Sequence, residues 1–134
     1  MSENVTTSNP ATIHRPPGGG YAHVAVTKPG LRIIEIAGQV GYTVAGTISE
    51  EFHQQVRQSF ANLKAALESV GAAPRDVTKI RYYIKDFDKD KLQHLRLAVQ
   101  EFYGSEYRAP STLIPVPTLF DPHVLFELEA SAAY

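Results

Sequence analysis

Hydrophobic residues in the middle of the chain recur with the period of an α-helix. Steps of four, four, three, four and three residues separate the members of a first set, which are Phe52, Val56, Phe60, Leu63, Leu67 and Val70. This spacing puts all of them on one face of a helix. Thr47 with Glu50, or Ser49 itself, is a candidate cap for its start, and Gly71 is placed to end it. The pattern predicts an amphipathic helix that buries one face.

A strand and a second helix are predicted in the next part of the chain. The run Val77–Lys85 alternates between an apolar face of Ile80, Tyr82 and Ile84 and a polar face of Lys79, Arg81 and Tyr83. Only the first face suits a core. After the charged connection Asp86–Asp90, apolar residues at helical spacing run up to Tyr103-Gly104, and these are Leu92, Leu95, Val99 and Phe102.

Runs rich in β-forming residues near both ends of the chain predict the remaining strands. Ala22–Thr27 and Leu31–Ala37 flank Lys28-Pro29-Gly30, so we expect them to form a hairpin. Ser111–Pro115 and Val124–Ala132 are joined by a loop that contains prolines, and they are the last two strands. The predicted order is ββαβαββ, an α+β fold in which two helices cover one face of a mixed sheet.

The last predicted strand has two faces of different character. Val124, Phe126, Leu128 and Ala130 point one way, and we expect them to face the helices. The other face consists of Leu125, Glu127, Glu129 and Ser131. A face that mixes apolar and acidic groups is neither a good core nor an ordinary solvent surface. We therefore expect another subunit to pack against it.

Composition indicates one domain with a polar N-terminal extension. A chain of 134 residues with 43% hydrophobic content can bury one core. Residues 1–20 are rich in Ser, Thr, Asn, Pro and Gly and are too polar to pack by themselves. We expect them to form a flexible arm, with residues 21–134 as the folded domain.

Charge and residue types exclude several classes of function. The 13 basic and 14 acidic residues leave a formal charge of -1, and no basic run suits a phosphate backbone, so nucleic acid is not the expected partner. The chain has no cysteine for disulfides, thiolate chemistry or zinc ligation. No histidine has the spacing with acidic residues that a metal site needs. No segment suits a membrane span or a signal peptide, so we expect a cytoplasmic protein.

Four segments together resemble the reactive intermediate deaminase family, also called Rid or YjgF and of the L-PSP type. They are Ile36–Val40, Val56–Lys64, Ala109–Leu113 and Phe126–Ala130. The resemblance runs from about Tyr21 onward. It implies a chorismate mutase-like (Rid) fold and a homotrimer whose sheets meet in a central barrel, with small-molecule clefts between subunits. It also implies hydrolysis of enamines and imines such as 2-aminoacrylate to a keto acid and ammonia, without a cofactor.

The resemblance assigns roles to several residues. Glu127 takes the position of a glutamate that orients or activates water, and partial desolvation would raise its pKa to suit proton transfer; the alternative is a structural ion pair across an interface. Tyr21 matches a tyrosine that lines the cleft, or is a packed aromatic. Gly38 matches a glycine whose backbone amide approaches the substrate, or is only a bulge. Thr112 stands where the family has Cys or Thr. His23, two residues after Tyr21, is either an acid in the same cleft or a solvated or interface side chain.

Two positions depart from the family. Ala37 replaces a common serine, which removes a hydroxyl donor. Pro110 replaces the arginine that holds the substrate carboxylate, and proline offers neither a charge nor a backbone N–H. Arg96 and Arg108 are candidates for a displaced clamp, although an arginine is more often an ordinary surface residue.

These departures predict a changed substrate. The hypothesis is a divergent Rid-like enzyme acting on an enamine, imine or related small electrophilic intermediate. One open alternative is a trimer that binds a small molecule without catalysis. The other is the endoribonuclease label attached to parts of the family, against which the pI of about 6.5 and the absence of a basic stripe argue.

Overall fold

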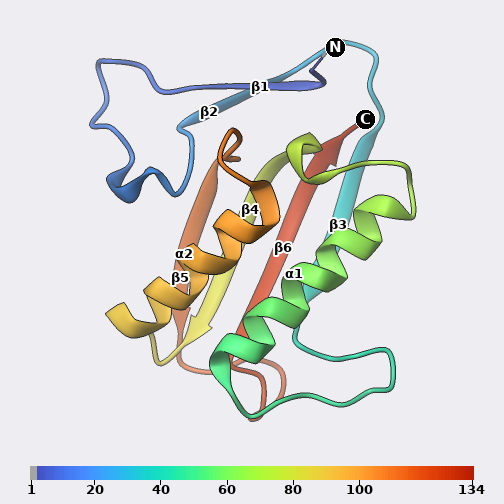
Figure 1. Ribbon diagram of the computed structural model, residues 1–134, viewed down its shortest axis with the longest axis vertical. Coiled ribbons are helices and arrows are strands. Elements are labelled where there is room, and N and C mark those ends of the chain that lie inside the picture. Colours follow the sequence, from blue (N-terminus) through green and yellow to red (C-terminus); the bar gives the residue numbers. More distant parts are fainter. Residues whose placement is uncertain (1–2) are drawn as a thin grey trace.

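Two helices lie across one face of a four-stranded sheet (Figure 1). The computed structural model describes residues 3–134. In chain order the elements are β1 (Val5–Ser8), η1 (Pro17–Gly19), β2 (Val24–Thr27), β3 (Ile33–Gln39), α1 (Phe52–Glu68), η2 (Pro74–Asp76), β4 (Val77–Lys85), α2 (Lys89–Tyr103), β5 (Ser111–Val116) and β6 (Phe126–Ala133). The predicted α+β fold, with two helices on one face of a mixed sheet, is confirmed.

The strand order in the main sheet is β3-β6-β4-β5. β4 and β5 run parallel because α2 connects them as a crossover, whereas β6 is antiparallel to both β3 and β4. The central strands β4 and β6 show the burial alternation that their sequences predict. β3 and β5 are therefore the opposite edges of the sheet, and this separation matters for the site.

The core lies between the helices and the inner face of the sheet, which is the face turned toward them. Phe60 of α1 packs against the rings of Tyr82 and Phe126, which stack on each other with centroids 6.2 Å apart. The other members of the predicted inward set are fully or almost fully buried, namely Val124, which precedes β6, and Leu128 and Ala130 on β6. Burial of this kind contributes roughly 1.5–3 kcal/mol for each large apolar side chain.

The ends of α1 differ from the prediction in detail. The helix stops at Glu68, so Val70 lies beyond it and is 37% exposed, although Gly71 does follow with a φ of +84°. Glu51 is the N-cap residue and makes no side-chain cap bond. The Ser49 hydroxyl instead accepts a hydrogen bond from the Glu51 N–H at 3.0 Å, one step before the helix.

The predicted hairpin of the first two strands is wrong. β2 pairs with β1, from Val5↔Thr27 to Ser8↔Val24, and β3 pairs with β6. The turn residues between β2 and β3 gave a local hairpin signal, but β3 buries Ile36 only by lying beside β6 over the helices. β1 falls within the segment expected to be a loose arm, and its Val5 is 1% exposed.

The small sheet of β1 and β2 lies at the end of the molecule where both termini are found (Figure 1). The outer face of the main sheet, turned away from the helices, presents the alternate residues of β6, which are half-buried. Within residues 3–134, neither helix combines the length and the apolar character that crossing a membrane requires.

Candidate active site

Glu127 and Gly38 lie against each other on the outer face of the sheet. They belong to the neighbouring strands β6 and β3, whose register shifts between Ile36 and Gln39. A Cβ atom built on Gly38 would lie 1.8 Å from Glu127 Oε2 and 2.8 Å from its Cδ, far inside van der Waals contact. The carboxyl group therefore occupies space that only glycine leaves free. Gly38 lies in a bulge, and the Glu127 carboxyl, the candidate catalytic group, packs against this bulge.

The surroundings of Glu127 suit a group that exchanges protons. Burial raises the pKa of its carboxyl above the ordinary value, and the negative charge of Glu129 raises it further. Among the described residues, no cation forms an ion pair with Glu127. An ion pair within the chain is thus not what holds this carboxyl.

Glu129, two residues further along β6, is held by different partners. The Tyr83 hydroxyl donates a hydrogen bond to Glu129 Oε1, and Arg81 is the cross-strand partner of Glu129 on β4. This hydrogen bond is the largest cause of the raised pKa of Tyr83. The two carboxyls on this strand face therefore have different surroundings, and Glu127, next to Gly38, receives no hydrogen bond like the one from Tyr83 within the part of the chain that the structure describes.

Ala37 and Thr112 offer little beyond their backbones. Ala37 is exposed, and its carbonyl accepts a hydrogen bond from Gln39 Nε2 at 3.1 Å. Thr112 lies on β5, where its hydroxyl accepts a hydrogen bond from Lys79 Nζ at 3.0 Å. Because β5 is the far edge of the sheet, Thr112 does not meet Gly38 within one chain.

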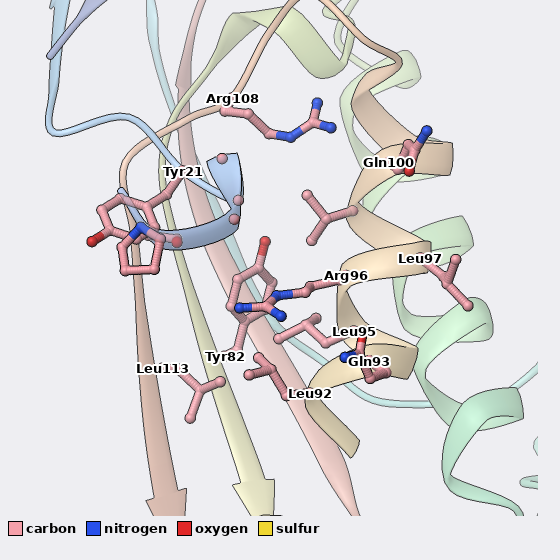
Figure 2. Close-up of a pocket in the computed structure, with 16 residues that line it drawn as sticks. Tyr21, Tyr82, Leu92, Gln93, Leu95, Arg96, Leu97, Gln100, Arg108 and Leu113 are labelled. Atoms are coloured by element: carbon pink, nitrogen blue, oxygen red, sulfur yellow. The ribbon is translucent and has the colours of Figure 1, made fainter. Parts of the chain in front are cut away.

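A cavity of about 510 Å³ opens on the other side of the sheet, next to β5 (Figure 2). Its walls come from the η1 segment 17–20, from α2, and from the inner faces of β4 and β5. Three residues singled out from the sequence line it, namely Tyr21, Arg96 and Arg108. We call this hollow the β5-edge cavity.

The two arginines of the β5-edge cavity are held differently. Figure 2 shows Arg96 extending from α2 into the cavity. A Cβ on Gly18 would lie 3.3–3.6 Å from three atoms of its guanidinium group, so the glycine loop rests against Arg96. Arg108 donates through Nη1 to the carbonyls of Gly104 and Tyr107 and lies 6.0 Å over the Tyr103 ring.

Sequence reasoning missed three polar members of the cavity wall. Gln93 and Gln100 flank Arg96 on α2 at spacings of three and four residues, a helix-face pattern that a search for polar stripes would have found. Tyr82 was recognised only as a core residue. Burial raises the pKa of its hydroxyl, and the positive charge of Arg108 partly opposes that shift.

Pro110 and His23 lie near the β5-edge cavity without lining it. Pro110 precedes β5, and its carbonyl accepts a hydrogen bond from Ile80 N at 3.1 Å. The His23 ring packs edge-on against Tyr21 with centroids 5.6 Å apart. Its Nε2, however, lies 2.6 Å from the His14 carbonyl oxygen, so the ring is tied to the N-terminal segment.

The predicted site residues thus form two groups, one on the neighbouring strands β3 and β6 and the other around β5 at the far edge of the sheet. Ala37, Gly38 and Glu127 lie at the β3 side on the outer face. The β5 side holds the other predicted site residues, which are Tyr21, His23, Arg96, Arg108, Pro110 and Thr112. Among residues 3–134, no group of three histidine and acidic side chains gathers that could hold a metal ion.

The chain is similar to known proteins over most of its length. Residues 12–134 match the sequence model of the family described as Endoribonuclease L-PSP. A 2-iminobutanoate/2-iminopropanoate deaminase of Dermatophagoides farinae is 28% identical over 82 residues, covering 60% of this chain and 62% of the deaminase. This match therefore spans less than two thirds of the deaminase. A RutC family protein of Pyrococcus abyssi is 30% identical over 105 residues, covering 74% of this chain and 76% of that protein.

A solved structure matches nearly the whole fold. It is YyfB from Yersinia pestis, described as a protein of unknown function of the conserved Rid protein family. The TM-score is 0.91 and the identity 31%, with 98% of this chain and 99% of that chain covered. The likeness includes the N-terminal segment with β1 as well as the main sheet.

Proposed function

The chain belongs to the endoribonuclease L-PSP family, which includes the Rid and YjgF proteins, and from that membership we propose that it hydrolyses a reactive imine or enamine to a carbonyl compound and ammonia. The observation that carries the proposal is the contact between Glu127 and Gly38. It leaves a carboxyl of raised pKa, free of a cation within its own chain, beside exposed backbone.

Glu127 acts as the proton-transferring group in this reaction. In its ionised form it takes a proton from water as the oxygen adds to the carbon of the protonated imine, which gives a neutral carbinolamine. The protonated Glu127 then gives its proton to the carbinolamine nitrogen, the C–N bond breaks to release ammonia, and the hydroxyl proton leaves to water as the C=O bond forms. A pKa raised toward the working pH suits both steps, and such catalysis contributes about 10²–10⁴-fold. An enamine substrate first takes a proton on carbon to become the imine.

The complete site forms between two copies of the chain. One copy supplies Glu127 and Gly38 from its β3 side, and the next supplies Tyr21 and Arg96 from its β5 side. The separate placement of the two groups supports this arrangement, because two further strands lie between β3 and β5 in the sheet. The outer face, where Ile33 is 79% exposed, is the surface that a homotrimer with a central barrel would cover.

The substrate differs from 2-aminoacrylate or binds it in another way. Pro110 removes the charged clamp, and a carboxylate left without a partner in a partly buried site is strongly disfavoured. A trimer that binds a small molecule without turnover is the second candidate, favoured by the size of the β5-edge cavity. A ribonuclease has less support, because 13 basic against 14 acidic residues attract no phosphate backbone.

Ammonia release is the test. The native chain, Glu127→Gln and Pro110→Arg are each given 2-aminoacrylate generated in situ and, in parallel, a neutral imine. We expect the native chain to release ammonia from at least one substrate and Glu127→Gln to lose about 10²-fold or more. Pro110→Arg is expected to raise turnover of 2-aminoacrylate by about tenfold, because it restores a charge-assisted pair.

Glu68→Gln is the matched control, since it neutralises an exposed glutamate at the end of α1. This control should release ammonia at the rate of the native chain. Ligand binding that survives in Glu127→Gln while no variant releases ammonia would indicate the binding protein instead. Equal turnover by the native chain and Glu127→Gln would contradict the assignment of the proton-transferring group.

A further inference from the structure

The β5-edge cavity has the chemistry of a site for an anion with an apolar tail. Arg96 and Arg108 both line it, and none of the described residues in its wall is acidic. The apolar part of the wall comes from Leu92, Leu95 and Leu113, and the other polar side chains of the wall are neutral. Its volume of about 510 Å³ lies within the range of roughly 300–1,000 Å³ that small-molecule sites occupy.

Arg96 is the cation available to a ligand. In the described part of the chain it forms no ion pair with a carboxylate and its guanidinium donates no hydrogen bond, whereas Nη1 of Arg108 already donates to two backbone carbonyls. Gly18 lies beside the Arg96 guanidinium, and its φ of +67° disfavours any residue with a Cβ there. A planar guanidinium without a carboxylate partner keeps its donors for the carboxylate of a ligand.

The depth of the cavity indicates how a ligand lies in it. Arg96 is exposed, while the neighbouring Leu95 on α2 is 4% exposed and Val99, one turn further along, is 5% exposed. The charged position is thus at the mouth, and the apolar wall continues inward. A molecule whose carboxylate and reacting carbon are adjacent would keep both at the mouth and extend its side chain inward.

We infer that Arg96 binds the carboxylate of a 2-imino acid that carries a branched or aromatic apolar side chain, and that this side chain fills the β5-edge cavity. Arg96 thereby replaces the clamp that position 110 lacks, and it does so from the α2 side of the site. That the bound acid is a substrate rests on the proposed function; that the cavity binds such an acid does not.

Binding of a stable 2-oxo acid tests the inference without any turnover. Isothermal titration calorimetry compares 4-methyl-2-oxopentanoate with pyruvate, with inorganic phosphate and with the neutral 5-methylhexane-2,3-dione. We expect the native chain to bind the branched acid about tenfold or more tightly than pyruvate, because its extra carbons are buried. Phosphate, which has no apolar part, should bind more weakly still.

Variants of Arg96 test whether its positive charge binds the carboxylate. Arg96→Gln should weaken binding of 4-methyl-2-oxopentanoate by roughly tenfold or more and leave the dione unaffected. Arg96→Lys should lose less affinity, since lysine keeps the positive charge but lacks the planar pair of donors. Arg57→Gln, which removes an exposed arginine from α1, is the matched control and should bind like the native chain. Thermal unfolding of each variant verifies folding.

The outcomes separate the two proposals. Arg96→Gln behaving like Arg57→Gln, the dione binding as tightly as the acid, or phosphate competing equally would each overturn the inference. Acid binding that depends on Arg96 in a protein that releases no ammonia would uphold the inference and refute the proposed reaction. Ammonia release that does not depend on Arg96 would uphold the proposed reaction and refute the inference.

Discussion

The outer face around Glu127 and the β5-edge cavity around Arg96 are opposite in almost every property. The first is acidic, lies on sheet residues and depends on one close contact with backbone. The second is basic and apolar and is built from a helix and a glycine-rich segment. Proton transfer needs an exact local position, whereas ligand binding needs volume and charge. The chain thus separates the two requirements, with Glu127 and Gly38 on β6 and β3 and the cavity beside β5 at the far edge of the sheet.

Gly38→Ala should have the largest effect on the acidic region. The added Cβ must displace the Glu127 carboxyl, which is the end of a flexible side chain and can move at little cost in stability. We expect turnover to fall about 10²-fold with little change in Tm, as measured by ammonia release and thermal unfolding.

Gly41→Ala is the contrasting variant for that measurement. Its Cβ would lie 2.7 Å from the Gln55 Cα atom, which cannot move aside, so it should destabilise the fold by about 1–3 kcal/mol. A large loss of stability in Gly38→Ala would mean that position 38 is only a structural glycine.

Mixing two defective proteins tests whether the regions meet between copies. Glu127→Gln and Arg96→Gln are unfolded together and refolded as mixed oligomers. If each site takes Glu127 from one copy and Arg96 from the next, about a quarter of the sites regain both groups. At low substrate, kcat/KM should then rise several-fold above that of the unmixed pair. No rise in demonstrably mixed oligomers would place both groups in one chain's site.

Glu129→Gln should have a smaller effect, which is a shift in the pH dependence of kcat/KM. The charge of Glu129 adds to the raised pKa of Glu127, so its removal lowers that pKa. The ionised Glu127 is the active base, and the acidic limb of kcat/KM should therefore move to lower pH. Glu50→Gln, an exposed change before α1, is the control. A limb that stays in place would show that the two carboxyls are not coupled.

The smallest expected effect is on stability: Glu127→Gln should make the folded state slightly more stable. The folded pKa lies above the unfolded value, so the folded state binds more protons between the two values and loses stability as pH rises through that window. The variant should raise Tm by at most a few degrees near neutral pH and by nothing well below the ordinary glutamate pKa. An equal gain at both pH values would assign it to packing instead.

Much of the fold could be predicted because its signals are periodic. The inward set of β6 and the limits of β4 follow from side-chain alternation, which depends only on neighbours along the chain. The partner of β2 could not be predicted in this way. Val5–Ser8 is a short polar segment, and its pairing with β2 depends on the path of the residues between them. Likewise, nothing in the spacing of Arg96 revealed the cavity that it lines.

The sequence by itself determined the class of fold, the two-faced character of β6, the family and the missing arginine at position 110. Each of these depends on residue identity or on local periodicity. Only the tertiary structure decided that the Glu127 carboxyl lies against Gly38, that Arg96 lies beside Gly18, and that the first pair is on the β3 side of the sheet while the second is next to β5. Such facts depend on strand order, register and packing between distant segments, which local patterns do not encode.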